Sequence, residues 1–207
     1  MKKIILSAVA VMAFGFANAQ EVKYGVKGGL NLSNFSGDTE GVNLKSKAGF
    51  NVGGFVEIKL SDKFAIQPEL LYSTQGAKAD NQQEEIGDVI YTADVCFNLS
   101  YINVPVMFKY YVADKFNVEA GPQIGFLTSA KTKTTVEGFS GSNEMDVKDA
   151  FESIDFGLNF GAGYDFTDHF NAGLRYNLGL ANIAKTDAGD DTKLHNGVFS
   201  LSVGYKF

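Results

Sequence analysis

The chain has 207 residues, of which 45% are hydrophobic and 13% aromatic, and its formal net charge at pH 7 is −6. This acidic balance argues against nucleic-acid binding, because phosphate recognition needs clustered Lys and Arg. The single cysteine, Cys96, excludes an intramolecular disulfide framework and a cysteine-based zinc site.

The first residues predict a secretory signal peptide over residues 1–19. Two lysines precede an apolar run, and the small residues of Ala17-Asn18-Ala19 follow it. The run is too short for a stop-transfer helix, and this order of basic, apolar and small residues is typical of a cleaved leader. We therefore expect an exported domain that spans residues 20–207.

After the leader, apolar and polar residues alternate with a period of two, as in strands with one apolar and one polar face. In 153–166, SIDFGLNFGAGYDF, the alternation runs through the glycines and no helical pattern follows, which excludes a dinucleotide-binding loop. Phe55 is an exception, a large apolar residue on a polar face. The predicted strands are residues 22–32, 48–60, 64–74, 102–112, 116–126, 153–166, 170–180 and 199–207.

The connections between these eight segments are alternately short and long. Each short connection contains an aspartate, whose side chain can bond to its own backbone two residues on. The short connections are Leu60–Phe64 with Asp62, Val112–Phe116 with Asp114, and Phe166–Phe170 with Asp168. The long, polar connections are residues 34–46, 76–97, 128–150 and 182–195. This alternation places all short turns at one end of the strands and all long loops at the other.

The layout predicts an all-β fold, an eight-stranded antiparallel up-and-down transmembrane β-barrel in the outer membrane. Both termini and the short turns would be periplasmic and the long loops extracellular. The mean hydropathy of −0.05 is compatible with this fold, because strands that alternate lipid-facing and lumen-facing residues conceal their hydrophobicity. Aromatic residues near the short-turn end fit an interfacial girdle: Tyr24, Phe64, Tyr110, Phe116, Phe166, Phe170, Tyr205 and Phe207.

A soluble, lipocalin-like barrel of eight strands is the competing architecture. It would place the apolar faces inside, around a ligand, and the charged faces in water. The polar faces here are rich in Gly and Asn and carry isolated charges of both signs, unlike the dense Lys/Glu face of a solvated sheet. The composition of these faces therefore favours the membrane barrel.

Five stretches resemble the outer-membrane β-barrel family common in Bacteroidetes, the PorT-like group of small porin-family proteins. They are GVKGGLNLSNF, KFAIQPELLYSTQGAK, YINVPVMFKYYVADKFNVEAGPQIGFL, FGLNFGAGYDF and the terminal VFSLSVGYKF. The resemblance covers the whole mature chain and implies the barrel fold and the outer membrane of a Gram-negative bacterium, but hardly any molecular activity. The terminal Phe207 resembles the signal by which such barrels are passed to the insertion machinery.

The alternation also assigns charged side chains to the lumen. They are Lys23, Lys27, Lys59, Lys109, Arg175 and Lys206 on the positive side, and Glu57, Glu69, Glu119, Asp155 and Asp165 on the negative side. An eight-stranded barrel is only wide enough for its own side chains, so these charges should be paired. The candidate network is Lys27, Glu57, Lys59, Glu69, Lys109, Glu119, Asp155 and Arg175. We interpret it as a structural plug; the alternative is a narrow path for ions.

The sequence predicts no catalytic residue, cofactor site or metal site. A lipid-modifying hydrolase would need a serine, a base and an orienting carboxylate, and nothing near His195 singles out such a serine. His169 occupies a short turn, where its equivalents are lysines. Loop carboxylates lack the EF-hand spacing, and we interpret them as solvated acidic loops: Glu84, Glu85, Asp88, Asp187, Asp190 and Asp191.

These observations favour a monomeric structural or interaction scaffold that displays long acidic loops. Its expected partners are outer-membrane lipid, the insertion machinery through Phe207, and envelope proteins. The alternative function is a small porin that conducts ions or very small solutes.

Overall fold

The computed structural model describes residues 21–38, 44–86, 89–136, 141–186 and 192–207, and their side chains except those of residues 81–91. The signal peptide predicted over residues 1–19 lies outside these ranges. No helix within them is long and apolar enough to cross a membrane.

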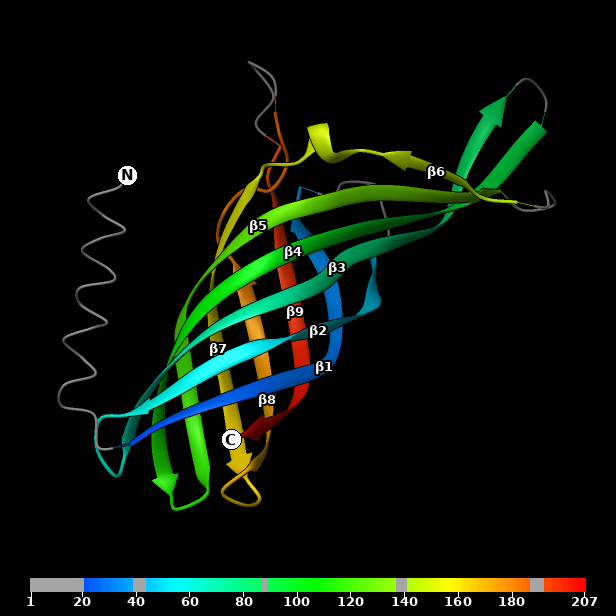
Figure 1. Cartoon of the computed structure of the whole chain (residues 1–207). Helices are drawn as coiled ribbons and strands as arrows, with labels where there is room; N and C mark the ends of the chain where they lie inside the picture. The colour runs from blue at the N-terminus through cyan, green and yellow to red at the C-terminus, as the bar shows by residue number, and fades with distance from the viewer. Residues whose placement is uncertain (1–20, 39–43, 87–88, 137–140, 187–191) are drawn as a thin grey trace.

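Eight strands close into a ring in which every neighbouring pair is antiparallel (Figure 1). The ring order is β1, β2, β3, β4, β5, β7, β8 and β9, and the β9–β1 pairing closes it. The short β6 pairs with β5 alone, outside the ring. The bounds are β1 Glu21–Gly37, β2 Leu44–Lys59, β3 Phe64–Ile86, β4 Val89–Ala113, β5 Phe116–Val136, β6 Asn143–Asp146, β7 Ile154–Asp165, β8 Phe170–Gly179 and β9 Leu194–Lys206, with the 3₁₀ helix η1 at Lys148–Ala150. The predicted eight-stranded up-and-down barrel is confirmed.

The apolar faces of the strands point outward and the polar faces fill the lumen. Leu30 is 70% exposed and Phe108 is 54% exposed, whereas Glu57 and Asn159 are each only 1% exposed. A lipocalin-like barrel would show the reverse, so that alternative is wrong. Phe55, the apolar exception in the lumen, lies opposite Gly25 in the β1–β2 register, and its ring occupies the space that the glycine leaves open.

Strands β3, β4 and β5 are much longer than the alternation predicted. They have 23, 25 and 21 residues, whereas β7 and β8 have 12 and 10. The segments 76–97 and 128–150, predicted as loops, therefore belong largely to strands, which project beyond the ring (Figure 1). The backbone ladder continues into these segments, as in the Gly76–Asn98 pair, although their outward side chains, such as Lys78 and Lys133, are polar and exposed.

A cluster of apolar side chains closes the lumen at the end that carries this projection. Phe151 and Ile183 come from connecting segments, which pair through an isolated bridge between Phe151 and Ala184. Ile183 is 0% exposed and Phe151 is 6% exposed, so both are core residues despite lying outside the strands. We call this group the apolar cap: Phe35, Ala77, Leu99, Tyr101, Leu127, Ala130, Phe151 and Ile183.

The short turns are held by a different residue from the one predicted. The Ser61 hydroxyl oxygen accepts hydrogen bonds from the backbone N–H of Lys63 and of Phe64, at 3.3 and 3.2 Å. Thr167 does the same in the last short turn, with 2.9 Å to the Phe170 N–H. In these two turns the oxygen thus comes from the residue before the aspartate; in the third turn that residue is Ala113, which has no side-chain oxygen.

The close approach of neighbouring strands in the ring can be tested at Gly121 on β5. A Cβ at this position would lie 1.9 Å from the backbone oxygen of Val106, whereas a Cβ at Gly173 would lie 3.6 Å from its nearest atom, the Ala162 oxygen. We expect Gly121→Ala to destabilise the barrel by about 1–3 kcal/mol, because a backbone atom must move, and Gly173→Ala to have little effect. The measurement is the heating temperature at which the fast-migrating, folded form disappears from a gel. Equal temperatures for the two variants would contradict the close approach.

Candidate functional site: the charged lumen

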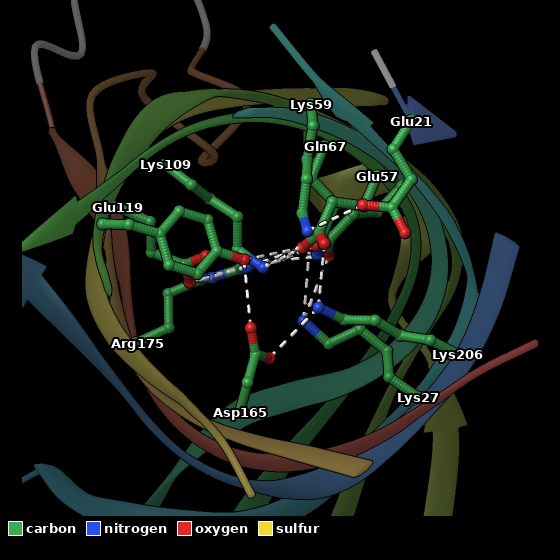
Figure 2. Close-up of polar contacts among 12 residues, drawn as sticks. Glu21, Lys27, Glu57, Lys59, Gln67, Lys109, Glu119, Asp165, Arg175 and Lys206 are labelled. Carbon is green, nitrogen blue, oxygen red and sulfur yellow. Dashed lines mark hydrogen bonds and ion pairs between the residues drawn. The ribbon is translucent and has the colours of Figure 1, made fainter. Parts of the chain in front are cut away.

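The layer of lumen side chains nearest the short turns centres on Glu57. Its two carboxylate oxygens accept hydrogen bonds from Lys109 and Lys206, each at 2.8 Å. Lys206 also contacts Asp165 at 3.1 Å, and the Tyr111 hydroxyl donates to Asp165 at 3.1 Å. These side chains come from β2, β4, β7 and β9, so the layer ties together strands around the ring (Figure 2).

The next layer centres on Glu69. Arg175 donates to both Glu69 oxygens, at 3.0 and 2.9 Å, and its Nε donates to Glu119 at 2.9 Å. Lys27 lies 3.3 Å from Glu69, whose side chain is 0% exposed. A two-pronged arginine–carboxylate pair of this kind fixes orientation as well as charge. Gln67 donates to Glu69 at 2.7 Å and accepts from the Lys109 amine at 2.7 Å, and so joins the two layers.

The charges of the two layers balance. Four cationic and four anionic side chains take part: Lys27, Lys109, Arg175 and Lys206, and Glu57, Glu69, Glu119 and Asp165. Taking such charges out of water is costly, and close pairing is what makes their burial tolerable. The arrangement therefore acts as a neutral, cross-linked filling of the lumen.

Amide and hydroxyl side chains fill the lumen between the charges and the apolar cap. Asn31 donates to Ser73 at 3.0 Å and accepts from Asn51 at 2.7 Å, and Asn177 donates to Asn159 at 3.2 Å. Two cavities lined by these amides and by the charged side chains have volumes of about 40 and about 20 Å³. A cavity of this size holds about one or two water molecules, which leaves no room for a solute.

Two of the eight candidate residues lie apart from the network. Lys59 pairs with Glu21 at 2.8 Å at the short-turn mouth, where its side chain is 34% exposed and lines a cavity of about 280 Å³. Asp155 lies near the apolar cap and accepts a hydrogen bond from Asn196 at 2.8 Å. Its other oxygen has no hydrogen-bond partner among the described residues. The structure thus brings together the other six.

Tyr111 is the network residue that sequence reasoning missed. It lies inside the fourth predicted strand, residues 102–112, but was not among the side chains assigned to the lumen. Its position has the same parity as Lys109, so the alternation itself places it in the lumen. Asp165 and Lys206 were assigned to the lumen by the alternation but not to the candidate network.

The side chains of both histidines contact backbone oxygens. His195 Nδ1 lies 2.8 Å from the Ala181 oxygen, and His169 Nδ1 lies 2.8 Å from the Lys206 oxygen. Neither ring is hydrogen-bonded to a serine in the part of the chain that the structure describes. In that same part, no three His, Cys, Asp or Glu side chains form a metal-binding group. The acidic side chains predicted for the loops lie outside the described residues: Glu84, Glu85, Asp88, Asp187, Asp190 and Asp191.

Removal of the Glu69 charge tests the network. In Glu69→Gln the buried Arg175 and Lys27 lose their shared carboxylate, and an uncompensated buried charge costs about 3–5 kcal/mol. We expect a correspondingly lower free energy of unfolding in urea for protein refolded into lipid vesicles. The matched control is Glu144→Gln, which removes an exposed partner of Lys131 and should leave the urea midpoint unchanged. Equal midpoints for both variants would contradict the structural role of the lumen charges.

Comparison with known proteins gives a family and two structural likenesses. The model of the family described as "Outer membrane protein beta-barrel domain" matches residues 17–185. The barrel is similar to the crystal structure of Neisserial surface protein A, with a TM-score of 0.52 and 14% identity over 91% of this chain and 100% of that one. It is also similar to the attachment invasion locus protein Ail of Yersinia pestis, solved in complex with the heparin analogue sucrose octasulfate, with a TM-score of 0.51 and 15% identity over 91% and 100%. Identities this low show the fold alone. A search of curated protein sequences finds no significant match.

Proposed function

The chain belongs to the family of outer membrane protein beta-barrel domains, and we propose that it is a closed scaffold that carries an interaction sheet outside the cell. The observation that carries this proposal is the filled lumen. Balanced ion pairs, amides and the apolar cap follow one another along the barrel axis. The two cavities among these layers have volumes of about 40 and about 20 Å³, and a cavity of about 280 Å³ opens at the short-turn mouth.

The projecting sheet supports the interaction part of the proposal. Strands of about 9–11 residues are enough to cross a bilayer, and β3, β4 and β5 have about twice that length. The extra length forms a continuous ladder on a rigid barrel, and surfaces held on such scaffolds are where binding usually occurs. Envelope or extracellular proteins are the partners that such a sheet would meet.

Three finer assignments belong to the same proposal. The stretches quoted from the sequence support membership of the PorT-like group of Bacteroidetes. Phe207 is 70% exposed at the end of the last strand, which suits a signal read by the insertion machinery.

We also propose that the barrel is a monomer without catalytic activity, whose termini and short turns face the periplasm. The short turns at one end support this orientation, because outer-membrane barrels have short periplasmic turns and longer extracellular loops.

Single-channel recording tests the closed lumen. We expect refolded protein, shown to be folded by its fast migration on a gel, to give no conductance steps in a planar bilayer, because the ion-paired layers and the cap leave no continuous water path. Lys109→Ala and Glu119→Ala serve as comparison variants. Discrete steps in the wild type that change size in these variants would show that the lumen charges line a pore, and the small-porin alternative would replace the scaffold.

Cys96 provides a test of orientation, because it is the sole cysteine and lies on the projecting part of β4. We expect a maleimide attached to a large polymer, which cannot cross the outer membrane, to label Cys96 in intact cells. The control is Asp62→Cys in a Cys96→Ser background, which should be labelled only after the outer membrane is permeabilised. The opposite pattern of labelling would reverse the proposed orientation.

A further inference from the structure

The outward-facing residues of the wall formed by β2 to β5 change in chemical character with distance from the short turns. Tyr72, Ile102 and Phe126 share one row in the strand register and end the apolar band. A hydroxyl row follows, in which the Tyr72 hydroxyl donates to Ser100 at 3.1 Å and Thr128 donates to the Ser100 backbone oxygen at 2.9 Å. Apolar side chains, then tyrosine and hydroxyl groups, are the order expected at a membrane interface.

Lysines occupy the next two rows of this wall. In the register, Cys96 on β4 pairs with Lys78 on β3 and with Lys133 on β5, and Lys78 pairs in turn with Lys45 on β2. Lys131 lies one row closer to the hydroxyl groups, opposite Asn98. On β2 to β5 these two rows therefore hold four lysines and no carboxylate.

Carboxylates on the same strands come one row further out, and on β6 they lie at the edge of the sheet. Asp80 contacts Lys45 at 2.9 Å, and Glu144 of β6 contacts Lys131 at 2.5 Å. Lys78 and Lys133 are both exposed. Lys133 lies opposite Glu144 in the β5–β6 register, at the edge of the sheet, whereas Lys78 lies between Lys45 and Cys96. Because Lys78 and Lys133 lie on strands to either side of β4, they are about 10 Å apart. The wall thus presents exposed cations next to its lipid-facing band.

We propose that this lysine surface, Lys78 and Lys133 with their neighbours Lys45 and Lys131, binds the phosphate groups of lipids in the outer leaflet. The charge is complementary, because lysines near an anionic lipid surface are attracted to its phosphate groups. The apolar and hydroxyl rows directly beneath would hold the acyl chains and the glycerol or sugar region of the same lipid. A free phosphate ion in solution would contact neither the apolar row nor the hydroxyl row. The inference rests on the proposed orientation, with the projecting sheet outside the cell (Figure 1).

The test measures lipid binding to the purified barrel in detergent micelles by native mass spectrometry. The probes are lipid A with its phosphates and the same lipid after phosphatase treatment. We expect the wild type to retain the phosphorylated lipid preferentially, and the double variant Lys78→Ala/Lys133→Ala to bind it roughly tenfold or more weakly. Lys63→Ala, which removes an exposed lysine at the other end of β3, should bind like the wild type.

Each result bears directly on the proposal. Equal retention of the two lipids, or equal binding by the double variant and Lys63→Ala, would overturn it. Displacement of the lipid by excess inorganic phosphate would show an anion site that does not require lipid, which also overturns it. Failure of the proposed orientation is recognised separately, because Asp62→Cys in the Cys96→Ser background would then be labelled in intact cells while the micelle experiment kept its lysine dependence. That result would overturn the assignment to the outer leaflet. Conductance of the lumen does not affect any of these readouts.

Discussion

Compensation of buried charge inside a closed ring is the constraint on which this structure depends. The ring leaves little space for water among the lumen side chains, so the ionised groups of the two layers are compensated by counter-charges on other strands. Glu69 shows the consequence: it is held by Lys27 of β1 and Arg175 of β8, and thereby links opposite parts of the ring. The ion pairs act as internal cross-links between strands whose outer faces contact lipid.

The same constraint explains the order of layers along the axis. The balanced ion pairs occupy the half of the lumen nearer the short turns, amides follow, and the apolar cap completes the filling. The buried Lys47 lies towards the cap, where its amine donates to the Gln75 backbone oxygen. Asp155 stands where the amide layer meets the cap and has Asn196 in place of a cation. This filling is the observation on which we base the proposal of a closed scaffold for the projecting sheet.

The outer surface follows a second pattern, imposed by the layered environment of a membrane protein. An aromatic girdle marks the short-turn end, an apolar band covers the middle, and hydroxyl groups and lysines succeed one another towards the projecting end of β2 to β5. The side chains of the lumen and those of the outer wall therefore follow separate patterns on the same strands. Alternation of side chains allows this independence, because neighbouring residues face opposite sides.

The sequence by itself determined the strand count, the up-and-down order, and which face of each strand is polar. These follow from local rules: a period of two assigns every residue to one side, and three short turns fix the direction of the chain. Only the tertiary structure decided which charges meet, because Glu69 and Arg175 lie 106 residues apart and their heights in the lumen depend on the register between strands. It also decided the length of β3, β4 and β5 and the burial of Phe151 and Ile183. Apolar–polar alternation is lost where the outward side chains of a strand are polar and exposed, and a core residue outside a strand has no periodicity to reveal it.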